Sequence, residues 1–506
     1  MVAASPKGYT GATVFAPNIS DHSVCPMTAK PLFFILGLLL LVLSVILVPP
    51  LLTDIIFQHE DWKIFAFCIV VSAFFGGGLV MTQRTQSLHF TLREAFLANV
   101  LGWLLVCAFS ALPFHFCQLD LTFTDSFFEA VSGLTTTGAS IMIRLDDAAP
   151  GILIWRAMLQ WIGGLGILIT ALSVAPYLSI GGMQIFRAEL SENEKTLPRM
   201  ISLSLSVFLI YCALTLACLL SYLAAGMGKF DSLAHAMTTV STGGFSTHDA
   251  SLGYFENPAL QYIASFFMLL SALPFLLYLK VLKGHTGALL RDSQVRWFLG
   301  MLILAILACT TSLIRTEHMP LEEAFRSASF NIVSLASGTG YTVENYNLWN
   351  GFVFTLFFFL MAVGACAGST SCGIKIFRFQ ILWAVIQIQF KRLLYPNGTF
   401  IAHYNGRPLP RDVPLSVLSF LFLYALSFAG LSLILAFLGL DTLTALSGSI
   451  SALSNVGPGL GDVIGPMGNY ASLPNTVKWV LSFGMLLGRL EILSVLILFH
   501  PAYWRE

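Results

Sequence analysis

The sequence predicts an all-α integral membrane protein that contains four similar pore-loop repeats. Of its 506 residues, 56% are hydrophobic and only 10% are charged, whereas a soluble domain carries roughly 25% charged residues. Ten apolar stretches are long enough to be candidate membrane spans, each of which needs about 20 residues. A short semi-polar segment that ends in a glycine-containing turn recurs four times. The net charge of zero gives no indication of a nucleic-acid partner.

The candidate spans run through the whole chain after a polar N-terminal segment. They lie near residues 31–52, 63–82, 96–116, 152–177, 201–225, 258–281, 297–314, 351–390, 413–439 and 475–500. Residues 1–30 are too long for a signal-peptide n-region, and no clear cleavage site follows the first apolar run. We therefore expect that run to be a retained transmembrane helix.

The distribution of charge predicts the orientation. If the N-terminus is cytoplasmic and the spans alternate, most of the 26 Lys and Arg residues fall on the cytoplasmic side, as in known membrane proteins. Most of the 26 acidic residues fall outside or at the outer mouth. An acidic mouth would concentrate cations, although ordinary solvation of the surface explains the same pattern equally well.

The recurring polar segments are the most informative feature of the sequence. They are FEAVSGLTTTGAS (128–140), AHAMTTVSTGGFS (234–246), SFNIVSLASGTGYT (329–342) and SGSISALSNVGPGL (447–460). Their key glycines are Gly138, Gly243, Gly340 and Gly457. Each follows a short helical stretch, and acids open these stretches, where they suit the positive end of the helix dipole. The acids are Asp125, Asp231, Glu322 with Glu323, and Asp441. A repeated unit of this kind should be identified before any fold is named.

These short stretches cannot span a bilayer and are therefore expected to re-enter it. Non-helical backbone at membrane depth is tolerated only when it is buried in protein or lines a wet cavity. Four such loops around a pseudo-fourfold axis would bring their carbonyl groups together, and a ring of carbonyls can replace the hydration shell of a cation. A single cluster of small residues, such as GGLG at 163–166, more often just allows close helix packing. Four copies in similar positions favour a pore.

The motifs SGLTTTGAS, VSTGGFSTHD, SGTGYTVENY and SNVGPGLGDV resemble the four filter loops of the Trk/Ktr/HKT potassium transporter superfamily, most closely those of its bacterial TrkH-type subunits. The resemblance implies two N-terminal transmembrane helices (31–92) and four M1–P–M2 repeats (93–180, 181–284, 285–395 and 396–506). It also implies a homodimer in the bacterial inner membrane and a cytoplasmic TrkA-type nucleotide-binding ring. The transported ion would be potassium, with no organic cofactor in this chain.

By the same resemblance, three positions in each loop coordinate the ion. They are Thr136, Thr137 and Gly138; Ser241, Thr242 and Gly243; Gly338, Thr339 and Gly340; and Asn455, Val456 and Gly457. Gly138 favours potassium, because a serine at this place accompanies sodium transport in plant members. Gly338 departs from the pattern, since a hydroxyl residue is commoner there. A sodium-permeable or sodium-coupled transporter, including a symporter, therefore stays open as an alternative.

Two features are expected below the filter. Arg489 lies near the middle of the last span, and ionisable residues there are functional candidates. We interpret it as a positive barrier in the ion path; the alternative is a structural pair with an acid other than Glu491. The stretch GACAGSTSCG (364–373) contains Gly364, Gly368 and Gly373 and is followed by Lys375. It resembles the family's intramembrane loop, which blocks the pore from below, although a close-packed kink would give the same pattern.

An intramembrane enzyme is the remaining alternative. His248 and Asp249 could form an acid–base pair, but no nucleophile or metal-binding set accompanies them. The nine cysteines form no CxxC motif and lie mostly in apolar segments, which indicates buried thiols and not a zinc site or a disulfide framework. The sequence thus predicts a transporter and not an enzyme.

Overall fold

The computed structural model describes residues 29–82, 92–173, 197–410 and 412–504. Within these ranges the protein is mostly helical, and seven helices are long and apolar enough to cross a membrane. Two further pairs of helices pass the same test if each bent pair is counted as one span. The prediction of an all-α, multi-pass membrane protein is confirmed.

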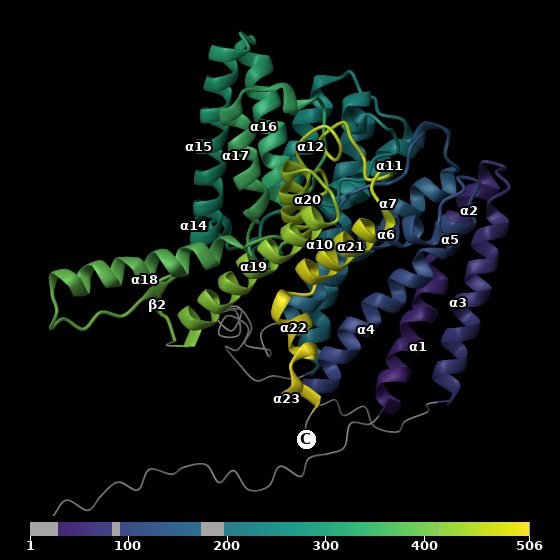
Figure 1. Ribbon diagram of the computed structural model, residues 1–506, viewed down its shortest axis with the longest axis horizontal. Helices are drawn as coiled ribbons and strands as arrows, with labels where there is room; N and C mark the ends of the chain where they lie inside the picture. Colours follow the sequence, from purple (N-terminus) through teal and green to yellow (C-terminus); the bar gives the residue numbers. More distant parts are fainter. Residues whose placement is uncertain (1–28, 83–91, 174–196, 411, 505–506) are drawn as a thin grey trace, which may run out of the picture.

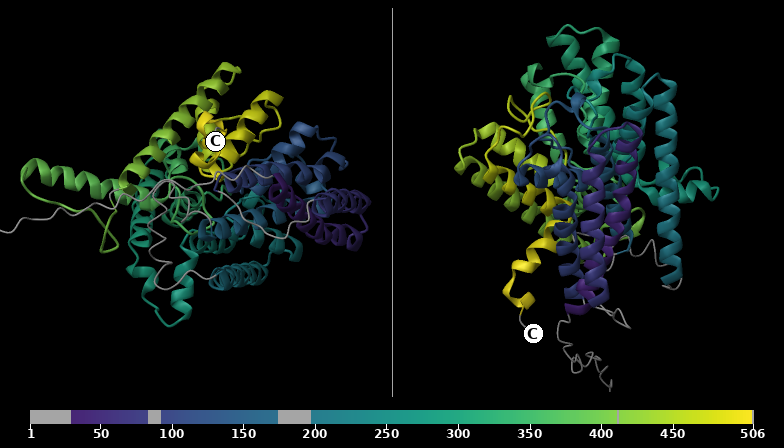
Figure 2. Two further views of the ribbon diagram at one scale, coloured as in Figure 1. Left: turned by 90° about the horizontal axis from the view of Figure 1, so that it is seen from below. Right: turned by 90° about the vertical axis from the view of Figure 1, so that its right-hand side faces the viewer.

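Three helices precede the repeats. They are α1 (Ala29–Ile46), α2 (Val48–Ile56) and α3 (Trp62–Thr82). Helices α1 and α3 pack closely because Gly37 and Gly76 face each other: a Cβ at either would lie within 3 Å of the other's carbonyl oxygen. The buried Asp54 of α2 accepts a hydrogen bond from the amide of Gly151 (2.6 Å), which ties this hairpin to the first repeat. Figure 2 shows these three helices on the side of the body away from the projecting arm formed by α18.

Each of the four repeats has an outer helix, a short pore helix and an inner helix. The outer helices are α4 (Leu92–Ser110), α10 (Leu197–Ala224), α15 (Ser293–Thr316) and α19 (Asp412–Phe437). The pore helices are α6 (Phe123–Leu134), α11 (Lys229–Val240), α16 (Leu321–Ser337) and α20 (Thr442–Ser454). The inner helices begin with α7 (Pro150–Ser173), α12 (Pro258–Ser271), α17 (Gly351–Ala362) and α21 (Asn475–Arg489). This confirms the predicted fold class, while the residue boundaries assigned to the repeats stay a prediction.

The remaining elements are short or lie between repeats. They are α5 (Leu112–Phe116), α13 (Phe275–Leu282), α14 (Ala288–Arg291), α18 (Ile376–Leu394), α22 (Ile492–Leu496), α23 (Pro501–Trp504) and a hairpin of β1 (His403–Tyr404) and β2 (Arg407–Pro408). Short 3₁₀ turns lie at Leu145–Asp147, Ser251–Tyr254, Tyr346–Leu348 and Ile497–Phe499.

The pore helices are short and buried, as their acids and length predicted. They contain 12, 12, 17 and 13 residues, too few to cross the bilayer. Asp441 is the N-cap of α20 and accepts a hydrogen bond from the amide of Thr444 (3.0 Å). At the start of α6, the hydroxyl of Thr122 accepts from the amide of Asp125 (3.2 Å). These caps satisfy orphan amides at the helix starts.

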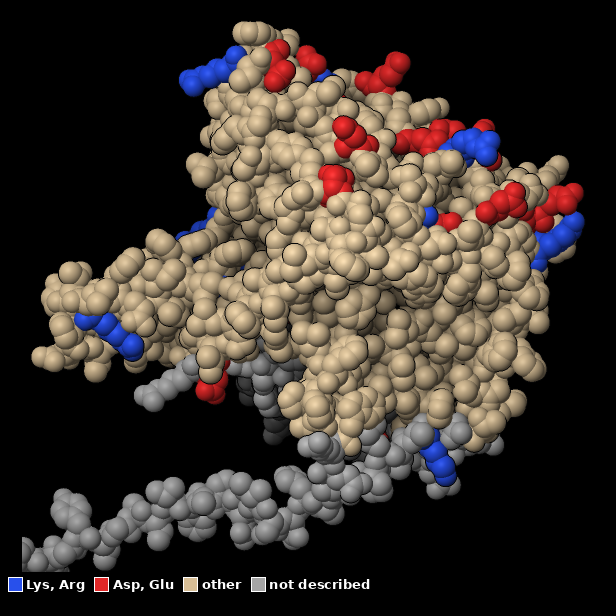
Figure 3. Space-filling view, viewed as in Figure 1, with Lys and Arg blue, Asp and Glu red and all other residues tan. Residues whose placement is uncertain are grey.

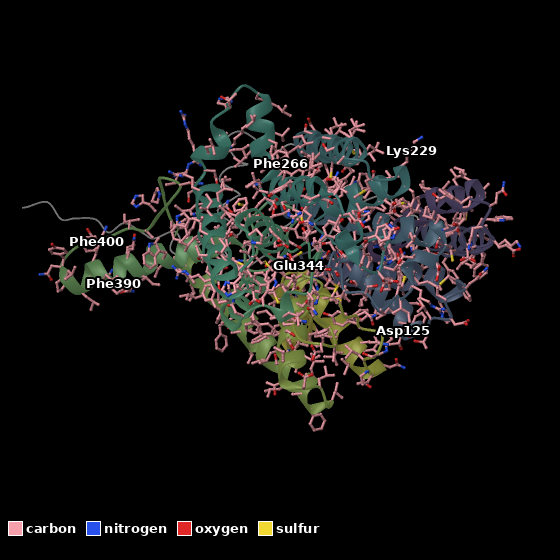
Figure 4. The ribbon with its side chains drawn as sticks, turned by 90° about the horizontal axis from the view of Figure 1, so that it is seen from above. Asp125, Lys229, Phe266, Glu344, Phe390 and Phe400 are labelled. Atoms are coloured by element: carbon pink, nitrogen blue, oxygen red, sulfur yellow. The ribbon has the colours of Figure 1, made fainter. Side chains whose placement is uncertain are left out.

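Three inner helices are broken, and one predicted span is wrong. The inner helix of the second repeat bends by 89° after Ser271, next to Pro274, and that of the fourth bends by 113° after Arg489. The stretch 351–390 was expected to be a span interrupted by small residues. It is not a span: α17 ends at Ala362, and α18 runs away from the body as an arm (Figure 1). Figure 4 labels Phe390 and Phe400 on this arm.

Acidic side chains gather at one end of the molecule. Figure 3 shows them over the upper part, the end at which the labels of α11, α12 and α16 lie in Figure 1. This agrees with the expected gathering of acids on one side, although Lys and Arg side chains also lie at this end (Figure 3). The direction of the chain across the membrane stays a prediction.

Candidate ion filter

The four loops that follow the pore helices have the same backbone conformation. Each helix is followed by a residue in the left-handed region, and these residues are Thr136, Thr242, Gly338 and Asn455, with φ of 54°, 52°, 74° and 53°. The next amide then donates to the carbonyl five residues earlier; these donors are Thr137, Gly243, Thr339 and Val456, at 2.9, 2.9, 2.9 and 3.1 Å. This is the Schellman pattern of helix termination.

A glycine with positive φ follows in every loop, and its position corrects the alignment of the second loop. These glycines are Gly138, Gly244, Gly340 and Gly457, with φ of 85°, 78°, 79° and 102°. The sequence alignment placed Gly243 in this register, but the φ of Gly243 is not positive and its amide makes the Schellman bond. The residues Thr242, Gly243 and Gly244 therefore correspond to Thr136, Thr137 and Gly138. Ser241 is the C-cap of α11 and lies one residue before this set.

The four loops close into a ring. A Cβ built on Gly138 would overlap the carbonyl oxygen of Gly243, and one on Gly244 would overlap that of Thr339. The same relation joins Gly340 to Val456 and Gly457 to Thr137. Each loop thus packs its glycine against the carbonyl of the next loop, and the fourth contact returns to the first loop. This cyclic arrangement explains why a glycine recurs at this position, since there is neither space nor a favourable φ for a side chain.

A small cavity lies directly on one side of the ring. Its volume is about 90 Å³, and all four ring glycines contribute to its lining. Residues of the loops that follow, among them Ser140, Ser246 and Thr342, form its walls. This polar cavity, whose floor is formed by the ring glycines, is called the entrance cavity below.

Buried polar side chains hold the ring from behind. The carboxylate of Glu129 on α6 accepts a hydrogen bond from the guanidinium of Arg156 on α7 (2.8 Å) and another from the amide of Ile141 (2.9 Å). Arg156 also donates to the carbonyl of Ser246 (2.8 Å), so the pair joins the first loop to the second. Hydroxyl groups pair within the loops, as in Thr135 with Thr137 (2.7 Å).

Gln160 on α7 contacts the second loop on both sides of Gly244. Its Nε2 donates to the carbonyl of Gly243 (2.6 Å), and its Oε1 accepts from the amide of Phe245 (3.0 Å). The side chain is fully buried. The sequence analysis overlooked Gln160, Arg156 and Glu129. The signal was present, because Arg156 and Gln160 are polar residues inside an apolar span, which usually have a function.

The intramembrane loop, residues 364–373, lies against the second and third filter loops. The hydroxyl of Thr370 accepts a hydrogen bond from that of Thr242 in the second filter loop (3.2 Å). The carbonyl of Gly368 accepts from the amide of Phe275 (2.9 Å), at the break between α12 and α13. Gly368 and Gly373 have positive φ (76° and 75°), and Lys375 donates to the carbonyl of Ser371. A Cβ on Gly364 would overlap the carbonyl of Cys372, so the two ends of the loop lie side by side.

Arg489 contacts this loop and forms no ion pair within the described part of the chain. Its guanidinium donates to the sulfur of Cys372 and to the carbonyl of Gly163 (2.7 Å). The side chain is buried, with 2% of its surface exposed. Glu491, which the sequence had already made a poor partner, instead pairs with Arg378 (2.8 Å). The alternative of a structural pair between Arg489 and an acid has no support among the described residues.

His248 lies at the wall of the entrance cavity. Its Nδ1 pairs with Asp146 of the first repeat, and its Nε2 lies 3.5 Å from Asp231 at the start of α11. Burial alone would lower the pKa of His248, but its contacts with the carboxylates of Asp231 and Asp146, together with their charges, raise it above its usual value. Its neighbour Asp249 accepts from the amide of Leu145 (3.1 Å). Both residues thus brace the loops at the mouth of the ring.

No metal-binding group forms elsewhere in the parts of the chain that the structure describes. No cluster of three or more His, Cys, Asp or Glu side chains could hold an ion there. The described cysteines are all free, and most of them are buried.

Fold and site together define a class: a multi-pass membrane protein in which four re-entrant loops form one ring. The family model TrkH, described as "Cation transport protein", matches residues 62–506. The chain is 40% identical over 486 residues to the Trk system potassium uptake protein TrkI of Halomonas elongata, covering 94% of this chain and 97% of the relative. It is 37% identical over 480 residues to TrkH of Salmonella typhimurium, covering 93% and 98%.

A solved structure agrees. The crystal structure of the potassium transporter TrkH from Vibrio parahaemolyticus matches with a TM-score of 0.88 at 33% identity, covering 95% of this chain and 100% of that one. The chain therefore belongs to the TrkH family of cation transport proteins. This is a family of transporters and not of enzymes, which confirms the resemblance and the expected class.

Proposed function

We propose that this protein takes up potassium through the ring formed by its four filter loops. One observation carries the proposal: four carbonyls and four glycines from four repeats meet in a closed cycle. Such a ring can replace the hydration shell of a cation, and the pore helices direct the negative ends of their dipoles toward it. Relatives named as Trk system potassium uptake proteins support potassium as the ion.

The coordinating groups would be backbone carbonyls of the three aligned residues in each loop. These are Thr136, Thr137 and Gly138; Thr242, Gly243 and Gly244; Gly338, Thr339 and Gly340; and Asn455, Val456 and Gly457. The unusual Gly338 supports the third loop, because glycine adopts the left-handed conformation at lower cost than threonine. The third turn has the same hydrogen bond as the others, so its backbone is held equally well.

The gate would be the intramembrane loop together with Arg489. The loop contacts the filter residue Thr242, and Arg489 connects the loop to the inner helix of the first repeat through Gly163. A fixed positive charge in a narrow, poorly solvated path repels cations. Moving the loop away from the ring would break the bonds at Thr370 and Gly368 and open the lower side.

The setting of the protein is also part of this proposal. The chain would lie in the bacterial inner membrane with a cytoplasmic N-terminus, form a homodimer, and be gated by a TrkA-type nucleotide-binding ring. Lys375, at the end of the intramembrane loop, lies between the gate and the arm to which such a partner could bind. A partner that binds the open state more tightly would shift the population toward it.

The test is flux through the purified protein in lipid vesicles, with potassium and sodium measured separately. Potassium flux well above sodium flux, and competition for it by rubidium, are the expected results. Equal flux of both ions would favour the sodium-permeable alternative. Absence of flux both alone and with a TrkA-type subunit and nucleotide would contradict the proposal.

A further inference from the structure

The ring is fourfold in its backbone but not in the side chains behind it. Gln160 lies ten residues after the first residue of α7. The residues at the same distance along α12, α17 and α21 are Met268, Met361 and Met485. All four side chains are buried. One repeat therefore places an amide where the other three place a thioether.

The three methionines occupy places equivalent to that of Gln160. Met268 belongs to the hydrophobic cluster that contains Tyr341 of the third loop. Met361 shares a cluster with Val456 of the fourth loop, and Met485 shares one with Ala139 of the first. Each of these inner helices thus shares a hydrophobic cluster with the filter loop of the next repeat, whereas α7 is bonded to the second loop through Gln160.

The second loop is adapted to the amide. Gly243 is the only one of the four aligned carbonyl residues that has no side chain, since the others are Thr137, Thr339 and Val456. A Cβ on Gly243 would overlap the amide of Gln160. The glycine therefore makes the space that allows Nε2 to reach the carbonyl at 2.6 Å. The polar residue and the missing side chain form one matched pair.

The consequence is an unequal ring. Among the described residues, the carbonyls of Thr137, Thr339 and Val456 accept no hydrogen bond, whereas that of Gly243 accepts one from Gln160. An oxygen that already accepts a hydrogen bond directs part of its electron density toward the donor and is held in place by it. It is a weaker ligand for an ion, and both the number and the field strength of carbonyl ligands affect selectivity.

We propose that Gln160 determines how strongly the filter distinguishes potassium from sodium, by engaging one of its four ring carbonyls. This rests on the proposed function, in which the ring is the filter. Gln160 does not touch the ion but acts through the carbonyl of Gly243. Its removal would make the four ligands equivalent and let the fourth carbonyl bind cations more strongly. Because a stronger ligand field favours the smaller ion, which approaches the oxygen more closely, the preference for potassium over sodium would weaken.

The direct test is Gln160→Met, which copies the residue found in the other three repeats. Potassium and sodium flux are measured in vesicles, and the apparent affinity is taken from the concentration dependence of potassium flux. We expect the apparent affinity for potassium to rise about fivefold, which is what one net hydrogen bond is worth in an equilibrium constant, and the potassium-to-sodium permeability ratio to fall. A merely structural role for Gln160 predicts a looser loop, in which the apparent affinity for potassium falls.

Two further variants complete the design. Gln380→Met is the matched control, because Gln380 also donates from a buried amide to a backbone carbonyl, that of Ser293 (2.8 Å), outside the filter. It should leave the ratio unchanged. If Gln160→Met fails to fold, Gln160→Met with Gly243→Thr supplies the Met/Thr pair of the third loop and refills the space beside the carbonyl. It should show the same rise in apparent affinity and the same fall in the ratio.

The outcomes separate this inference from the proposed function. Suppose that the apparent affinity for potassium does not rise, or that the ratio does not fall, in Gln160→Met or, where that variant does not fold, in the double variant. With normal potassium preference in the unmodified protein, this overturns only the role of Gln160. An unmodified protein without potassium preference contradicts the filter itself, whatever the variants show.

Discussion

Gly244→Ala tests the ring most directly, because this glycine was found from the backbone and not from the motif alignment. Its φ is 78°, a conformation that L side chains adopt with difficulty. The added Cβ would overlap the carbonyl oxygen of Thr339 and lie close to the backbone of Gly340. Neither neighbour is a flexible side chain, so the backbone of the second or third loop must move.

The magnitude follows from these two effects. A left-handed conformation costs a residue with a Cβ about 1–2 kcal/mol, and overpacking in a tight core costs about 1–3 kcal/mol. Together they destabilise the native ring by roughly 2–5 kcal/mol. Domains are stable by about 5–15 kcal/mol, so the variant should still fold. If only about 1.4 kcal/mol of the strain enters the barrier to ion passage, potassium flux falls about tenfold.

The assay is potassium flux in vesicles at equal amounts of folded protein, with thermal unfolding in detergent measured in parallel. Gly300→Ala is the matched control, because Gly300 lies in helix α15 and a Cβ there would meet no atom within 4 Å. Alanine is preferred over glycine inside a helix by about 1 kcal/mol, so this control should be neutral or slightly stabilising. Normal flux and normal selectivity in Gly244→Ala would refute the assignment of the ring as the narrow part of the path.

Three further predictions follow from the contacts around the ring. Arg489→Ala removes a buried charge and the bond to the intramembrane loop, so ion flux at equal protein level should rise severalfold; equal or lower flux would mean that the residue is only structural. Glu129→Gln leaves the charge of Arg156 buried without its partner, which should lower the free energy of unfolding by about 3–5 kcal/mol. The control Glu60→Gln, in an exposed ion pair, should lower it by at most about 1 kcal/mol. If chemical denaturation gives similar losses for both variants, the buried pair does not have the proposed role. Because the folded-state pKa of His248 is raised, its contribution to stability is complete below the ordinary pKa of about 6.5 and is lost as the pH rises through the raised value. The melting temperature should therefore fall across neutral pH. The fall should be smaller in His248→Gln.

The sequence alone determined the membrane class, the repeat and the family. The long apolar stretches, the acids that open the short helices and the four polar turns are local properties, because helix length, capping and glycine content act within a few residues. For the same reason the break at residues 364–373 could be predicted from its glycines, and the fate of the helix after it could not. The direction in which α18 runs depends on which surfaces of the other helices remain free for it to pack against.

Only the tertiary structure decided which atoms meet in the ring. The motif alone could not show whether Gly243 or Gly244 is the ring glycine of the second loop, because the two are adjacent. The assignment depends on which of them faces the carbonyl of Thr339. The contact between Gln160 and Gly243 joins residues 83 positions apart, and the contact of Arg489 with Gly163 joins residues 326 positions apart. Such pairs leave no periodic signal in a single sequence, since their proximity is set by the packing of whole repeats around a common axis.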